Sequence, residues 1–290
     1  MATATLKEIS LLKRAFSQND FDRFAKLSAD DNPIHVDPEF SARTRFGKTV
    51  AHGMMLYSFL SGVLSSKLPG AGMLQIKQDM MFQAPTYTDT EVNFKFEVIE
   101  ADDEKAVIST NLVLPNGSYG LQGSCEVLLP GWKTGFQGVN SEYASEPPSE
   151  CQEYKKIKVG QSVTVKRVFT EADLVEYSDL CGDKNPYYTS DAEAKKAGFK
   201  GRLVPGPLLN GMFSYILGTK LPGRGANWMK QSTYYPAPAY LNEELTATVK
   251  VTRLRPDKDL INLNCTVTNP KNELVCQAQS LLLIKDLEMN

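Results

Sequence analysis

A long apolar run followed by alternating segments dominates the first half of the chain. Residues 53–67, GMMLYSFLSGVLSSK, are apolar on nearly every face, which predicts a helix that is buried on all sides. Four later segments alternate apolar and polar residues, as half-buried strands do. They are residues 73–82, 91–100, 106–115 and 118–129. Because a fully apolar helix needs a cover, the pattern predicts an α+β fold in which an antiparallel β-sheet wraps around a long central helix.

A short helix opens each half of the chain. Ser17 is followed three positions later by Asp20, and Thr170 by Asp173, which is the spacing of a capping box. Each short helix should end before an Asn-Pro pair, because the residue before a proline is pushed out of the helical region. Both halves therefore begin in the same way.

The repetition extends well beyond these helices. When the sequence is shifted by 153 residues, LPGAG at 68–72 falls on LPGRG at 221–225, and DDNP at 30–33 falls on DKNP at 183–186. Matches continue at this offset from about residue 16 to about residue 127 of the first copy. A constant offset over so long a span predicts a tandem duplication. The strand pattern also returns in the second copy, over residues 244–254, 260–269 and 273–284.

The duplication divides the chain into two domains. We expect an N-terminal domain over residues 1–129, a linker rich in Gly, Ser, Pro and Glu over 130–157, and a C-terminal domain over 158–290. The two halves would pair their sheets within one chain. Such a pseudo-dimer is expected to be a monomer, and a homodimer is the alternative.

Charge and hydropathy narrow the classes of partner. A formal net charge of -2 gives no general reason to expect nucleic acid or a membrane surface as a partner. The most apolar segment carries several serines and falls short of a bilayer span, and the N-terminus lacks the apolar core of a signal peptide. The expected location is the cytoplasm.

Cysteines and histidines are few. The five cysteines are an odd number without a CxxC motif, so we expect buried, reduced thiols. With only two histidines and no paired cysteines, the sequence predicts no metal site.

Candidate chemistry concentrates in SADDNPIHVDPEF, residues 28–40. A turn at Asn32-Pro33 could bring Asp30 and His35 to one cavity, where a carboxylate and an imidazole that share a water make an acid–base pair. The alternative is a polar surface turn in which Asp30 caps the preceding helix and His35 is exposed.

A second group stands at the start of the apolar helix. The Gly53 N–H belongs to a helix N-terminus, which suits a carbonyl oxygen that gains negative charge. His52 is expected to be a hydrogen-bonded residue of the helix start. Ser61, two turns further on, could face the cavity or bond back to the preceding turn.

The second copy retains the turn without the imidazole. Asp183, Asn185 and Pro186 remain, but Tyr188 and Pro205 stand where the first copy has its two histidines. A phenol with its ordinary pKa near 10 is a poor base at neutral pH. We therefore expect one half that is equipped for chemistry and one that is kept for its shape.

These motifs carry a family resemblance. SADDNPIH followed by AHGMM resembles the MaoC-like hydratases of the hot-dog fold, which include the (R)-specific enoyl-CoA hydratases. The resemblance implies tandem hot-dog folds and syn addition of water to a trans-2-enoyl thioester, or the reverse dehydration, with the CoA thioester as substrate and no cofactor.

The resemblance also implies roles for individual residues. Asp30 and His35 would hold the water, one taking its proton while the other protonates the α-carbon. The Gly53 N–H would stabilise the thioester enolate. Ser61 matches a serine beside the site, and Asn32 and His52 would support it. Two-domain relatives of the eukaryotic type keep the active motif in the second half, whereas here it lies in the first.

Other functions remain open. A 3-hydroxyacyl-acyl-carrier-protein dehydratase would use the same chemistry on another carrier. A hot-dog thioesterase would need a carboxylate but no Asn-Pro-x-His motif. A non-catalytic acyl-binding module would fit the second half alone.

Overall fold

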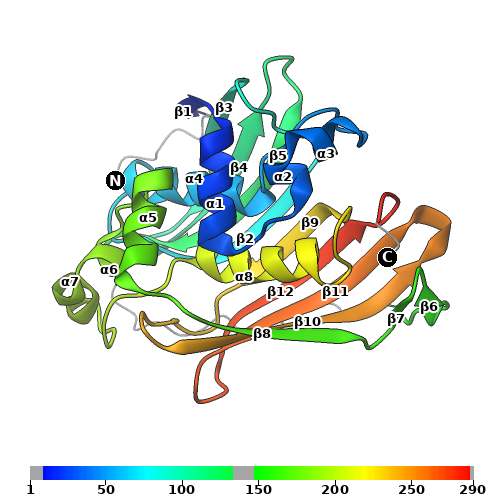
Figure 1. Ribbon diagram of the computed structural model, residues 1–290. Coiled ribbons are helices and arrows are strands. Elements are labelled where there is room, and N and C mark those ends of the chain that lie inside the picture. The colour runs from blue at the N-terminus through cyan, green and yellow to red at the C-terminus, as the bar shows by residue number, and fades with distance from the viewer. Residues whose placement is uncertain (1–8, 133–146, 288–290) are drawn as a thin grey trace.

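The computed structural model describes residues 9–132 and 147–287. The first half supplies strands β1 (Ile9–Ala15), β2 (Leu74–Phe82), β3 (Glu91–Ala101), β4 (Lys105–Val113) and β5 (Tyr119–Leu128). The second half supplies β8 (Ser162–Val168), β9 (Asn227–Tyr234), β10 (Glu244–Arg255), β11 (Leu260–Thr268) and β12 (Leu274–Leu283). These strands form one antiparallel ten-stranded sheet in the order β1-β3-β4-β5-β2-β9-β12-β11-β10-β8 (Figure 1).

The helices follow the same order in both halves. The first half contains α1 (Gln18–Ser28), α2 (Pro33–Val36), α3 (Pro38–Ala42) and α4 (Gly53–Ser66). The second contains α5 (Glu171–Cys181), α6 (Pro186–Thr189), α7 (Asp191–Lys196) and α8 (Gly206–Thr219), with a 3₁₀ turn at Pro256–Lys258. The long helices α4 and α8 lie against each other on one face of the sheet (Figure 1).

The two half-sheets join at a single seam. Strand β2 pairs with β9, from Lys77 opposite Tyr234 to Met81 opposite Lys230. This seam confirms the prediction that the halves pair their sheets within one chain. It also places α4 and α8 side by side, so that each half can contribute residues to the other.

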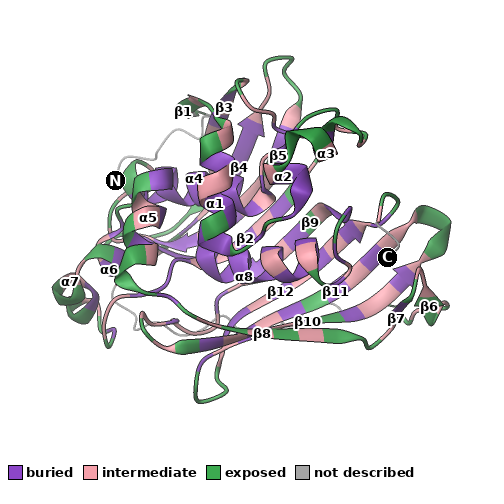
Figure 2. Cartoon of the chain, viewed as in Figure 1, coloured by how far each residue is buried: buried purple, intermediate pink, exposed green. Residues whose placement is uncertain are grey.

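Helix α4 is the centre of the first core. Every residue from Met54 to Ser65 is buried, as the apolar run predicted (Figure 2). Side chains such as Phe94, Ile108 and Val127 project from the sheet into the same cluster. The α+β fold with a sheet wrapped around a central helix is confirmed.

Both predicted helix starts are confirmed. Ser17 and Thr170 are N-cap residues, and each forms a capping box with the aspartate three positions on. The Ser17 N–H donates to Asp20 Oδ2 at 2.8 Å, and the Thr170 N–H donates to Asp173 Oδ2 at 2.7 Å.

The constant sequence offset is wrong for the last two strands of each half. Val98 lies opposite Ile108, and Val251 lies opposite Leu263, so the offset is 251 − 98 = 153 before the hairpin and 263 − 108 = 155 after it. The hairpin after β10 is two residues longer than its counterpart. Because the shift is even, the same faces of the strands still point at the helices.

The structure describes the predicted linker only in part. Half of the predicted linker, residues 133–146, lies outside the described residues. Its last part includes β6 (Glu153–Tyr154), which pairs with β7 (Ile157–Lys158). The domain boundaries stay a prediction. The strand pattern had not named β1 and β8, which lie at the two edges of the sheet.

The prediction of mostly buried, unpaired cysteines is confirmed. All five cysteines lie in the described part of the chain and are free; four are buried, and Cys151 is partly exposed. Within the described ranges, no helix is long and apolar enough to cross a membrane.

Candidate active site

The loop after α1 places Asp30 inside the molecule. Ala29 ends the helix in the left-handed conformation, with φ 63°, and Asn32 then caps α2 with Pro33 at its first position. The Asp30 side chain is buried, and its Oδ2 accepts a hydrogen bond from Ser214 Oγ at 2.5 Å. Its Oδ1 accepts from the Asn32 N–H at 3.3 Å. Asn32 thus supports the turn and the carboxyl group together.

His35, on α2, has its tautomer fixed by a backbone oxygen. Its Nδ1 lies 2.7 Å from the Val50 carbonyl oxygen. Because a carbonyl only accepts, Nδ1 carries the hydrogen and Nε2 is left with a lone pair. Burial lowers the pKa of His35 to about 4, so the ring is neutral at physiological pH. His35 is 8% exposed, so the surface-turn interpretation is wrong.

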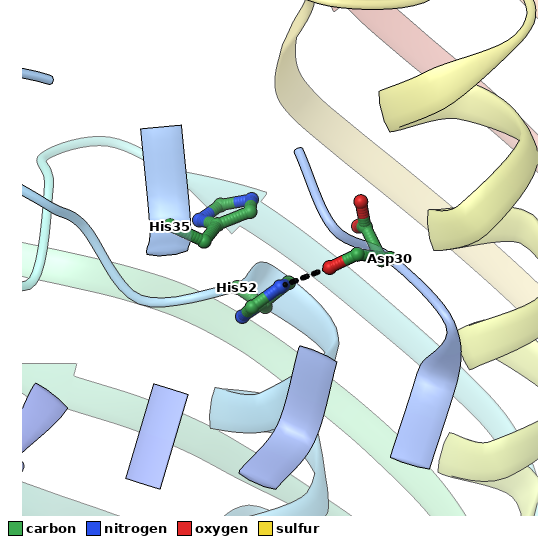
Figure 3. A group of neighbouring side chains, drawn as sticks. All are labelled: Asp30, His35 and His52. Atoms are coloured by element: carbon green, nitrogen blue, oxygen red, sulfur yellow. Dashed lines mark hydrogen bonds between the residues drawn. The ribbon is translucent and has the colours of Figure 1, made fainter. Parts of the chain in front are cut away.

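His52 supports this arrangement, as expected for a residue of the helix start. It is the N-cap residue of α4, and its Nε2 donates to the backbone carbonyl of Asp30 at 2.9 Å (Figure 3). Its ring stacks on that of His35, with centroids 3.7 Å apart and an interplanar angle of 28° (Figure 3). Burial also lowers the pKa of His52 well below its ordinary value.

Asp30, His35 and His52 could also be considered as metal ligands. One ligand atom from each lies within 4.8 Å of the others. Each ring directs one N–H at a carbonyl oxygen, as imidazole ligands of metals also do. One lone pair is left on each ring, at His35 Nε2 and at His52 Nδ1. The absence of a metal site stays a prediction from the sequence.

Gly53 begins helix α4 beside this cluster. As the first residue of the helix, its N–H has no acceptor inside the helix, and it lies at the positive end of the dipole. The ring of Phe82 covers the residue so closely that a Cβ at position 53 would lie 2.7 Å from Phe82 Cζ. Because glycine has no side chain, the Phe82 ring can lie this close to the start of α4.

The two halves enclose one cavity of about 410 Å³ over these groups. Asp30, His35 and Gly53 line it from the first half. The second half contributes mainly apolar groups together with Ser214 and Asn227. Its lining residues are Ser214, Leu217, Gly218, Ala226, Asn227, Trp228, Met229, Leu282 and Leu283.

The prediction that Ser61 could face this cavity is wrong. Ser61 Oγ donates to Asp183 Oδ2 at 2.8 Å, in the second half. The residue that bonds Asp30 is Ser214, at the corresponding position of α8. Each central helix therefore donates a serine hydrogen bond to the aspartate of the other half. The offset of 214 − 61 = 153 was the signal that could have identified Ser214.

Asp30 has the electrostatic environment of a group that exchanges protons. Burial raises the pKa of its carboxyl group to about 7, although the Ser214 hydroxyl and the Asn32 N–H act in the opposite direction. Near neutral pH the cavity therefore holds a carboxyl group that can give a proton and a neutral imidazole that can take one.

Two relatives of known activity match part of this chain. The chain is 36% identical over 121 residues to the (R)-specific enoyl-CoA hydratase of Aeromonas caviae, a match over 41% of this chain and 90% of that protein. It is 31% identical over 136 residues to a mitochondrial 3-hydroxyacyl-[acyl-carrier-protein] dehydratase of Arabidopsis thaliana, over 46% of this chain and 81% of that protein.

Comparison with solved structures covers both halves. A MaoC-like dehydratase superposes with a TM-score of 0.75 at 16% identity, over 95% of this chain and 97% of that one. A protein of Mycobacterium tuberculosis with a double hot-dog fold gives a TM-score of 0.74 at 12% identity, over 97% and 96%. The fold is therefore a double hot-dog.

A family model covers both halves of the sequence. The MaoC like domain matches residues 3–114 and again residues 152–272, together more than half of the chain. The chain therefore belongs to the MaoC-like dehydratase family.

Proposed function

We propose that the protein adds water to a trans-2-enoyl-CoA to give the (3R)-3-hydroxyacyl-CoA, or catalyses the reverse dehydration. The observation that carries this proposal is the buried Asp30–His35 pair, which lines a largely apolar cavity at the N-terminus of α4. Similarity to (R)-specific enoyl-CoA hydratases supports the same reaction.

The protonation states assign a direction to each proton. His35 Nε2 takes a proton from water while the water oxygen bonds to the β-carbon. The carboxyl group of Asp30 then gives its proton to the α-carbon. Because both groups reach the substrate from one wall of the cavity, the addition is syn. A proton transfer from His35 back to Asp30 restores the starting state, and dehydration follows these steps in reverse.

Negative charge develops on the thioester oxygen as the β-carbon is attacked. The Gly53 N–H and the positive end of α4 would stabilise it, and the largely apolar lining of the cavity would strengthen that interaction. His52 would contribute indirectly, since it holds the Asp30 backbone and stacks on His35.

A second candidate is the same reaction on an acyl-carrier-protein thioester. It is favoured by the similarity to the Arabidopsis dehydratase. The reacting atoms would be the same for either carrier. Hydrolysis of the thioester is a third candidate, which would use the carboxylate against the carbonyl carbon and would leave His35 without a role. Monomeric state and cytoplasmic location stay predictions.

The test is an assay with crotonyl-CoA, longer enoyl-CoAs and crotonyl-acyl carrier protein. The ultraviolet absorbance of the conjugated thioester should fall without release of free thiol, and chiral analysis should give the (3R) product. Faster turnover of the carrier-protein substrate would favour the second candidate. Thiol release without a 3-hydroxy product would contradict hydration.

A further inference from the structure

The two halves surround their corresponding aspartates, Asp30 and Asp183, with different hydrogen-bond donors. The carboxylate of Asp183 accepts three side-chain hydroxyls. Ser61 Oγ and Tyr177 OH donate to Oδ2 at 2.8 and 3.0 Å, and Ser65 Oγ donates to Oδ1 at 2.5 Å. The Asn185 N–H adds a fourth bond, to Oδ1, at 3.2 Å. Both oxygens of Asp183 are therefore occupied by the protein.

Asp30 retains only one of these hydroxyls, that of Ser214. At the sequence offset of 153, Tyr177 corresponds to Phe24, which has no hydroxyl, and Ser65 corresponds to Gly218, which has no side chain. Oδ1 of Asp30 is bonded by the Asn32 N–H at 3.3 Å.

Gly218 lies directly against the carboxyl group. A Cβ built at position 218 would lie 2.6 Å from Asp30 Oδ1, closer than two such atoms can approach. Asp30 and Gly218 both line the cavity. Phe24 is fully buried beside the site, with its ring centroid 5.1 Å from that of His52.

We propose that Phe24 and Gly218 are positioning residues of the Asp30 site, which act by withholding the two hydroxyl donors that saturate the carboxylate in the other half. Oδ1 of Asp30 is thereby left available to the substrate. This inference rests on the proposed function, in which Asp30 delivers a proton.

The physical reason is the cost of proton exchange. Hydroxyl donors stabilise the charged form of a carboxyl group, and in the second half they oppose the rise in the pKa of Asp183 that burial causes. A carboxylate whose four lone pairs all accept hydrogen bonds, as those of Asp183 do, must break one to take a proton. The working carboxyl group avoids this cost because two donors are absent.

The inference also gives the second half a role in the chemistry of the first. Helix α8 supplies both Ser214, which orients Asp30, and Gly218, which leaves its other oxygen open. Helix α4 supplies Ser61 and Ser65 to Asp183 in return.

The test restores the missing donors with Gly218→Ser and Phe24→Tyr. Each should lower kcat for crotonyl-CoA by about 10-fold, with a smaller change in KM, because the carboxyl group loses proton-transfer capacity rather than substrate affinity. Each should also lower the pKa of Asp30 by about one unit. That pKa is measured without substrate by carbon-13 NMR titration of aspartate-labelled protein, with the Asp30 signal identified from its absence in Asp30→Asn.

Matched controls remove the donors from the other half. Ser65→Gly and Tyr177→Phe should leave kcat and the titration of Asp30 unchanged, and thermal melting reports whether each variant is folded. If Gly218→Ser does not fold, Phe24→Tyr decides alone. Folded variants in which Asp30 titrates as in the wild type would overturn the inference. A lowered pKa in a protein that hydrates no enoyl thioester would sustain the donor assignment and contradict the proposed function instead.

Discussion

The loops at Asp30 and Asp183 make the same turn, but the space at the start of the long helix that follows differs between the two halves. Both aspartates precede an Asn-Pro pair that caps a one-turn helix. The first opens on a cavity of about 410 Å³, whereas the space at the start of α8 is about 30 Å³ and is lined by Tyr188 and Tyr235. The two copies therefore share the turn and the one-turn helix, whereas the larger cavity lies beside the aspartate of the first copy.

Tyrosines close the second pocket. Tyr235 stands where the first half has Phe82, and a Cβ at Gly206 would lie 2.5 Å from its ring. Its hydroxyl is bonded to Tyr57 OH and to Asn210 Nδ2, both at 2.8 Å. This buried hydrogen-bond chain links α4, α8 and the residue after β9, so the closed half contributes stability across the seam.

The largest expected effect comes from removing the base. His35→Ala should lower kcat for crotonyl-CoA by at least about 10²-fold, because no other neutral imidazole lone pair lies in the described lining of the cavity. Tyr188→Phe is the matched change in the other half, where burial raises the pKa of the phenol well above its usual value. It should cost little, and a large loss there would mean that both halves take part. Steady-state kinetics measure both.

The pH dependence follows from the two titrating groups. For hydration, kcat/KM should rise as pH passes about 4, where His35 becomes neutral, and fall above about 7, where Asp30 loses the proton that it must give. Initial rates from about pH 4 to about pH 9 would measure both limbs. Activity that increases through pH 7 would instead make Asp30 the base.

Removing the hydroxyl on Asp30 should have a smaller effect. Because the Ser214 bond lowers the pKa of Asp30, Ser214→Ala should move the alkaline limb to higher pH and reduce kcat by roughly three- to ten-fold. Ser61→Ala makes the same change at Asp183. Its expected cost is about 1 kcal/mol of folding free energy with unchanged kinetics, measured by denaturant unfolding and steady-state rates. A lowered kcat with unchanged stability in Ser61→Ala would instead place Ser61 at the active site.

The last prediction concerns stability rather than rate. The carboxyl group of Asp30 has a pKa of about 7 in the folded protein and an ordinary value of 3.8, so the folded state holds its proton more tightly. The resulting stabilisation is present below about pH 4 and is lost as pH rises through about 7. Relative to wild type, Asp30→Asn should therefore gain roughly 1 to 4 kcal/mol between about pH 4 and about pH 8. Urea unfolding at the two pH values measures this difference, and an equal gap at both would contradict the raised pKa.

Much of this architecture could be predicted because its signals are local. The apolar run at 53–66 becomes a buried helix, and the spacing of Asp30, Asn32, Pro33 and His35 predicts a turn that brings the acid and the base together. The edge strands β1 and β8 and the seam strand β9 were not among the predicted strands. The signal for β8 was present, because residues 162–165 alternate polar and apolar side chains.

The partner of each central serine could not be predicted in this way. Which aspartate a serine on α4 meets depends on how α4 packs against α8, and that packing follows from the β2–β9 seam. A long-range pairing of this kind leaves no mark in the residues around Ser61. The role of Gly218 was hidden for the same reason, since its contact with Asp30 crosses from one half to the other.

The central claim is that one of two matching aspartates carries the reaction. The most direct test is the initial rate of crotonyl-CoA hydration by Asp30→Asn and Asp183→Asn, measured side by side on folded protein. The account predicts a loss of at least about 10²-fold for Asp30→Asn and a rate close to wild type for Asp183→Asn, whose defect should appear only in stability. Equal losses in the two variants, or a larger loss for Asp183→Asn, would contradict it.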